Sequence, residues 1–229
     1  MMRSGRILLL IICMASFGAP ASALLIDNFS EPDDFSVSAG NSSVSSNNTF
    51  LDPADTLGGV RSWSLVANAQ GETATFSIPA GGGTAALTAE TSGGVLWFGY
   101  GRDPGGNPTI PLPFDLTASG TLNRFEVDVG AASATGTLEV LVRQITGGQV
   151  FTASLPVSAS GLLSIPYSSF SGSPDFTDIS YISLELALGN AGAVELTEFR
   201  AVPEPSVASL MAVGFLSLAA WRAAARRSG

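Results

Sequence analysis

Apolar and polar residues alternate along much of the chain between residues 24 and 202. In residues 124–129 every second side chain is apolar, and residues 73–78 and 181–188 follow the same rule. A period of two predicts β-strands that bury one face and leave the other in solvent. We therefore expect roughly ten to twelve strands in antiparallel sheets.

Glycine-rich turns separate these runs. The pair Gly147 and Gly148 lies between the alternating residues 140–145 and 150–155, and this arrangement predicts a β-hairpin. The alternation changes phase between Leu196 and Phe199, which predicts a bulge in the last strand.

The composition excludes several kinds of chemistry. The chain has 229 residues, 10 basic and 19 acidic; all the basic residues are arginines, and His is absent. Without His and Lys there is no Ser-His-Asp system, no His-ligated zinc and no Schiff-base lysine. The net charge of −9 argues against nucleic acid as a partner.

The N-terminal residues have the organisation of a secretory signal peptide. Arg3 and Arg6 precede an apolar run of 11 residues, 7–17, and Ala21 and Ala23 form a small-x-small cleavage site. We expect signal peptidase to cut after Ala23. The alternative is an uncleaved anchor, but the apolar run is too short to span a bilayer. The only cysteine, Cys13, lies within this run, so we expect no disulfide in the mature chain.

The C-terminal residues combine a short motif with an apolar run and a basic end. Pro203, Glu204 and Pro205 precede the apolar residues 207–221. The basic residues of the tail are Arg222, Arg226 and Arg227. This combination resembles the PEP-CTERM sorting signal of Gram-negative bacteria, and the resemblance covers residues 203–229. It implies an inner-membrane intermediate, processing by an exosortase, and delivery to the cell surface or extracellular matrix. The alternative is an ordinary single-pass tail anchor.

Residues 24–202 carry a second resemblance. Ile26-Asp-Asn-Phe opens the segment, Gly58-Gly-Val-Arg leads into a strand, and Leu163-Ser-Ile-Pro-Tyr-Ser-Ser-Phe precedes the final two runs. This order is similar to that of galactose-binding-like jelly rolls, some of which are carbohydrate-binding modules. We therefore predict an all-β, antiparallel jelly-roll β-sandwich at 24–202, flanked by a signal-peptide helix (1–23) and a transmembrane helix within 203–229.

Aromatic residues beside a glycine-rich loop are the candidates for binding a sugar. Trp97, Tyr100, Arg102 and Asp103 lie within seven consecutive residues that also contain two glycines. An aromatic ring can stack on the apolar face of a sugar, and an arginine and a carboxylate beside it can hydrogen-bond the sugar hydroxyls. The alternative is that Trp97 belongs to the core and the glycines make a turn. Further candidates for stacking are Trp63, Phe98 and Tyr167.

The acidic residues suggest a structural calcium ion. Residues 24–202 contain 18 acidic residues and five arginines, a formal charge of −13. Related jelly rolls often hold calcium where the first and last strands meet, and oxygen ligands suit that ion. Asp27 and Glu198 are the natural pair if those strands are neighbours. The alternative is a solvated acidic surface.

Three functions remain from the sequence. The first is a non-enzymatic protein of the cell surface or exopolysaccharide matrix; the second is a carbohydrate-binding module of that matrix. The third is a glycan-cleaving enzyme, which needs two facing carboxylates. Glu126, Asp128 and Glu139 lie on polar strand faces, where alternation alone explains them, and we assign no catalytic residue.

Overall fold

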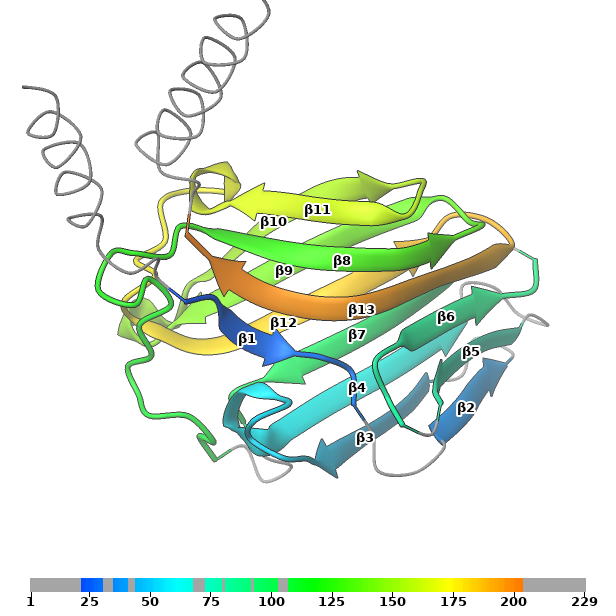
Figure 1. The fold of residues 1–229 in the computed structure, drawn as a ribbon, viewed down its shortest axis with the longest axis horizontal. Coiled ribbons are helices and arrows are strands. Elements are labelled where there is room, and N and C mark those ends of the chain that lie inside the picture. Colours follow the sequence, from blue (N-terminus) through cyan, green and yellow to red (C-terminus); the bar gives the residue numbers. More distant parts are fainter. Residues whose placement is uncertain are drawn as a thin grey trace, which may run out of the picture.

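The alternating runs form the strands of two antiparallel sheets that pack face to face in a computed structural model of the chain (Figure 1). The structure describes residues 22–30, 35–40, 44–67, 73–79, 81–91, 93–102 and 107–203. Within these ranges there are thirteen strands and three short 3₁₀ turns. No helix among these residues is long and apolar enough to cross a membrane.

One sheet has seven strands and the other has six. The seven-stranded sheet runs in the order β11 (Gly161–Pro166), β8 (Arg124–Ala132), β13 (Gly192–Val202), β6 (Ala85–Ala89), β5 (Thr73–Ile78) and β2 (Phe35–Gly40), with β1 (Leu24–Asp27) also paired to β13. The six-stranded sheet runs in the order β10 (Val150–Val157), β9 (Gly136–Gln144), β12 (Ile179–Leu188), β7 (Gly94–Tyr100), β4 (Val60–Ala67) and β3 (Val44–Phe50).

The long strand β13 joins the two ends of the domain. Its first half pairs with β6, and its second half pairs with β1, where Leu24 lies opposite Ala201. The described chain therefore begins and ends at the same end of the sandwich (Figure 1).

Several sequence predictions are confirmed. The described part is all-β and antiparallel, and β9 and β10 form the expected hairpin, with Val150 opposite Arg143. The register of β13 shifts between Leu196 and Glu198, which is the expected bulge. The narrower assignment to galactose-binding-like jelly rolls stays a prediction. The proposed signal-peptide and transmembrane helices lie outside the described residues.

The core lies between the sheets and contains the alternating apolar side chains of both. Phe76 from the seven-stranded sheet packs edge-on against Trp63 and Phe98 from the six-stranded sheet, each with ring centroids 5.4 Å apart. All three side chains are buried. Truncation of a buried Phe or Trp to Ala typically costs about 3–5 kcal/mol, so this cluster is a main source of stability in a domain without disulfides.

Candidate functional site

A buried ion pair connects the first strand to the opposite sheet. Arg61 donates from Nε to one oxygen of Asp27 at 2.6 Å and from Nη2 to the other at 2.7 Å. The same carboxylate accepts hydrogen bonds from the Tyr100 hydroxyl (2.9 Å) and the Phe29 amide (2.8 Å). Both side chains of the ion pair are fully buried. Removal of one partner of a buried pair costs about 3–5 kcal/mol, so we assign Asp27 a structural role.

The expected calcium pair is therefore wrong. Asp27 lies opposite Phe199, and both side chains point into the core. Glu198 is the neighbour of Phe199 in β13, so it points to the outer face and pairs with Arg200 at 2.6 Å. The two carboxylates lie on opposite faces of one sheet and cannot share an ion. Among the described residues, no group of three His, Cys, Asp or Glu side chains is arranged to hold a metal.

Tyr100 does not join Trp97 in a sugar site, and this prediction is wrong as well. The two residues are three positions apart in one strand, so their side chains point to opposite faces. Tyr100 is completely buried, and burial followed by the Asp27 carboxylate raises the pKa of its hydroxyl well above the ordinary range. Tyr100 therefore stabilises the interior.

Three further sugar candidates are also structural. Trp63 and Phe98 are buried in the core. Tyr167 stacks on Phe176 with ring centroids 3.8 Å apart, and its hydroxyl donates to the Leu116 carbonyl at 2.9 Å. Trp63 and Phe98 therefore offer no face to a ligand, and the half-buried Tyr167 is held by its contacts with Phe176 and Leu116. Asp103 lies outside the described residues.

Trp97 lies on the outer face of the six-stranded sheet, where it stacks on Tyr181 from the neighbouring strand β12. The ring centroids are 5.9 Å apart and the planes differ by 26°. A Cβ at Gly99 would collide with the Tyr181 hydroxyl and lie 2.6 Å from the Trp97 ring. The tips of both rings therefore meet above Gly99. Only glycine at this position lets them approach the backbone so closely.

Two carboxylates lie beside these rings. Glu185 on β12 is directly opposite Trp97 on β7 and directly opposite Glu139 on β9, so all three side chains share the outer face. Burial, and next the charge of Glu139, raise the pKa of Glu185 above its ordinary value. Like charges at directly opposite positions destabilise a sheet, so the arrangement has a cost in the free protein.

A single arginine on the same face lies close to Tyr181. Arg143 is opposite Tyr181 in the β9–β12 register. Burial raises the pKa of the Tyr181 hydroxyl, and the positive charges of Arg143 and Arg102 reduce this rise. Arg102 is half-buried and its backbone forms a β-bridge with Pro108; its role in binding a sugar stays a prediction.

The polar groups of this surface are left without protein partners. Within the described ranges, the indole N–H of Trp97, the hydroxyl of Tyr181 and the side chains of the other three residues make no hydrogen bond or ion pair. We call this surface the aromatic face and define it by Trp97, Glu139, Arg143, Tyr181 and Glu185. Tyr181, Glu139 and Glu185 were not singled out as a sugar site from the sequence, although alternation in residues 181–188 puts Tyr181 and Glu185 on the outer side.

The outer face of the seven-stranded sheet is charged but internally paired. Glu126 forms ion pairs with Arg124 and Arg200, both at 2.9 Å, and Arg200 also binds Glu198 at 2.6 Å. We call these four residues the ion-pair face. Glu126 is nearly buried, with 8% of its side chain exposed. Its carboxylate is held by two arginines, which makes it a structural group.

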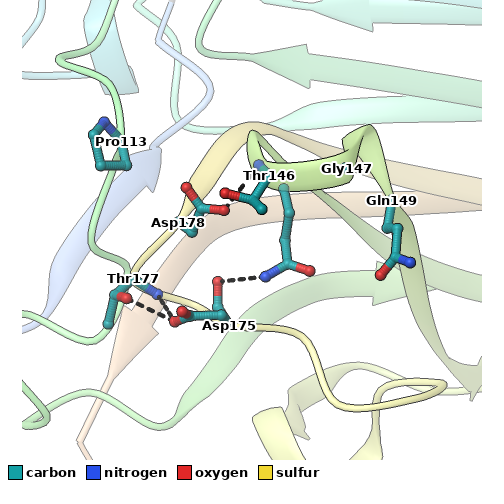
Figure 2. A pocket seen from close by; sticks show the side chains of 8 residues that line it. Pro113, Thr146, Gly147, Gln149, Asp175, Thr177 and Asp178 are labelled. Atoms are coloured by element: carbon teal, nitrogen blue, oxygen red, sulfur yellow. Dashed lines mark hydrogen bonds between the residues drawn. The ribbon is translucent and has the colours of Figure 1, made fainter.

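A polar pocket of about 590 Å³ opens at one end of the sandwich, where the β9–β10 turn approaches the loop before β12 (Figure 2). The lining residues are Pro113, Gln144, Thr146, Gly147, Gln149, Asp175, Thr177 and Asp178. Asp175 accepts from the Thr177 amide, and Asp178 accepts from the Thr146 amide, both at 2.9 Å. The Thr177 hydroxyl and amide lower the pKa of Asp175. These carboxylates stabilise turns, and no aromatic ring lines the pocket.

Most residues of the predicted sorting and processing signals lie outside the residues that the structure describes. Pro203 ends the described chain and Ala23 lies near its beginning, exposed to solvent. Ala21, Glu204, Pro205 and the arginines of the basic tail lie outside the described residues, so the sorting signal stays a prediction from sequence.

Solved structures of carbohydrate-related proteins are distantly similar to this chain. The family 11 carbohydrate-binding module of a cellulosomal cellulase of Clostridium thermocellum matches with a TM-score of 0.41 and 14% identity, over 81% of this chain and 96% of that one. TmCBM61 in complex with β-1,4-galactotriose matches with a TM-score of 0.32 and 12% identity, over 75% and 88% of the two chains. An exo-β-agarase matches with a TM-score of 0.39 and 13% identity, over 81% of this chain and 25% of the agarase.

No family model matches the chain, and no curated protein matches it. Similarity to solved structures as distant as this assigns neither a family nor a ligand. The functional assignment therefore depends on the aromatic face itself.

Proposed function

We propose that the domain binds carbohydrate through the aromatic face. The observation that carries the proposal is the position of Trp97 and Tyr181, whose stacked rings meet above Gly99 beside polar side chains that have no partner among the described residues. Sugars present an apolar face of C–H groups and a rim of hydroxyls. An aromatic surface with a few polar groups at its edge matches both.

The arrangement suits a polysaccharide more than a single sugar. Trp97 and Tyr181 come from neighbouring strands and stack on each other on the outer face. Glu139 and Glu185 accept hydrogen bonds at one end, and Arg143 donates at the other. A chain of sugars contacts both ends at once, whereas one ring reaches only part of the surface.

The sequence supports an extracellular location for this activity. We infer that signal peptidase removes residues 1–23 and that an exosortase processes the chain near Pro203, Glu204 and Pro205. The domain then acts at the cell surface or in the exopolysaccharide matrix as a non-enzymatic binding protein. Cell fractionation tests this step: intact chain retained in the inner membrane contradicts the sorting proposal.

Affinity electrophoresis with a panel of soluble polysaccharides tests the binding proposal. The full chain is purified in a polyoxyethylene detergent, which carries no sugar headgroup, and compared with Trp97→Ala. We expect at least one neutral or charged glycan to retard the wild-type chain, and the substitution to weaken retardation about tenfold, because stacking on one ring contributes roughly 1–2 kcal/mol.

A matched control removes an exposed apolar side chain from the opposite face. Leu162 on β11 is 52% exposed and lies opposite Asp128, on the outer side of the seven-stranded sheet. Leu162→Ala is expected to leave retardation unchanged. Absence of retardation by every glycan, or equal retardation of wild type and Trp97→Ala, contradicts the proposal. Release of new reducing ends would replace it with glycan cleavage.

A further inference from the structure

The carboxylate pair of the aromatic face indicates which sugars it favours. We propose that this face selects glycans with free amino groups, whose ammonium is held between Glu139 and Glu185 beside the ring of Trp97. The inference rests on the proposed function, because it names the class of sugar bound at that site.

Two like charges of the aromatic face lie side by side without a partner among the described residues. Glu139 and Glu185 are directly opposite on β9 and β12, and neither has a hydrogen-bond or ion-pair partner in the described part of the chain. Burial and the charge of Glu139 raise the pKa of Glu185. An ammonium group placed between them removes the repulsion and donates to both, since it carries three N–H donors.

An indole ring is next to the carboxylate pair. Trp97 is directly opposite Glu185 in the strand register, so the Trp97 side chain is the neighbouring aromatic group for a cation held by Glu185. The face of an indole attracts cations and is the best aromatic partner for them. A neutral N-acetylated sugar gains neither interaction, and a uronate is repelled by both carboxylates.

The charged residues around Glu139 and Glu185 leave room for a cation. Arg143 is four residues from Glu139 in β9, about 13 Å along the backbone, and it lies opposite Tyr181 and not opposite either glutamate. β10 adds only Ser154 opposite Glu139, and Arg102 acts at the Tyr181 end. The formal charge of −13 on residues 24–202 also favours polycations over polyanions at long range.

Two tetrasaccharides that differ only in acetylation test the inference. Isothermal titration of the full chain compares β-1,4-linked glucosamine with N-acetylglucosamine tetramers at about pH 6, where the amine is protonated. We expect the glucosamine tetramer to bind about tenfold more tightly, as for one charge-assisted contact. Glu185→Gln should remove this preference.

Asp128→Asn provides the matched control. Asp128 is exposed on the outer side of the seven-stranded sheet, so this substitution removes the same charge from the molecule but leaves the aromatic face intact. The preference should persist in Asp128→Asn.

Each other outcome has a defined meaning. Equal affinities for the two tetramers, or a preference that survives Glu185→Gln, overturn the inference while the binding itself leaves the proposed function standing. Equal loss in Asp128→Asn reveals a general charge effect and also overturns it. If neither these tetramers nor any polysaccharide of the panel binds, both the inference and the proposed function are wrong.

Discussion

The two outer faces of the sandwich use charged residues in opposite ways. On the ion-pair face, Glu126 lies between Arg124 and Arg200, and each charge has a partner within 2.9 Å. On the aromatic face, Glu139 and Glu185 stand opposite each other with no partner in the described chain. The first arrangement stabilises the fold on its own, whereas the second places two like charges side by side without a compensating charge among the described residues.

This difference separates structural from functional polar groups. Charges that satisfy one another have little to offer a ligand, because binding would first have to break their existing bonds. Donors and acceptors beside two aromatic rings that no described protein group occupies exchange only water for a ligand, and no bond within the protein has to break. Substitutions on the two faces should therefore affect different measurements.

The largest effect is expected from Glu126→Ala. The Glu126 side chain is nearly buried, and its removal leaves Arg124 without its ion-pair partner. Arg200 keeps only its ion pair with Glu198. The free energy of unfolding, measured by urea denaturation, should fall by about 2–3 kcal/mol. Glycan affinity should stay unchanged, and loss of binding in a folded Glu126→Ala chain would show that the two faces are coupled.

Gly99→Ala tests whether the ligand depends on the present positions of the Trp97 and Tyr181 rings. The added Cβ would collide with the Tyr181 hydroxyl and the Trp97 ring, so both rings must move from their present positions. Glycan affinity in titration calorimetry should fall about tenfold, or about 1.4 kcal/mol.

Gly130→Ala is the control for this change. Gly130 lies on the outer side of β8, where a Cβ would meet the Thr197 methyl group at 2.9 Å and a Glu195 carboxylate oxygen at 4.0 Å. Its affinity should equal that of wild type. An unchanged affinity in Gly99→Ala would mean that the ligand does not use the position of the rings.

Tyr181→Phe keeps the ring and removes only the hydroxyl. That hydroxyl has no hydrogen-bond partner in the described structure, so the melting temperature should not fall. If the hydroxyl binds a sugar, affinity should fall about fivefold, the value of one neutral hydrogen bond of about 1 kcal/mol. A stability loss without an affinity loss would assign the hydroxyl to the fold.

The smallest effect is expected from the pH dependence of Glu185→Gln. The folded protein raises the pKa of Glu185 through burial and Glu139, so the ionised form costs stability above that pKa. The cost disappears as the pH falls below the pKa of the unfolded chain. Glu185→Gln should therefore raise the melting temperature slightly at about pH 7 and not at about pH 3. An equal gain at both pH values would indicate packing instead of charge.

Alternation in the sequence was sufficient to predict individual strands. Residues 73–78 coincide with β5, and the phase change after Leu196 became the bulge in β13. These features depend on neighbours along the chain, which the sequence displays directly. The mistaken grouping of Tyr100 with Trp97 had a local cause: an odd separation in a strand places side chains on opposite faces.

The partners of each residue across the sheets required the folded structure. Trp97 meets Tyr181 and Glu185 only because β7 pairs with β12, and Glu139 joins them only because β12 pairs with β9. Asp27 and Arg61, 34 residues apart, meet because β1 and β4 belong to sheets that pack together. No period in the sequence encodes these neighbours.

The sequence by itself determined that the chain is a β-protein with an acidic domain, and it carries the predicted export and sorting signals. Tertiary structure decided which polar residues hold the fold and which remain free for a ligand. The physical reason is that burial and hydrogen bonding are properties of neighbours in space. The same residue type, glutamate, is paired with two arginines at Glu126 and opposite another glutamate at Glu185.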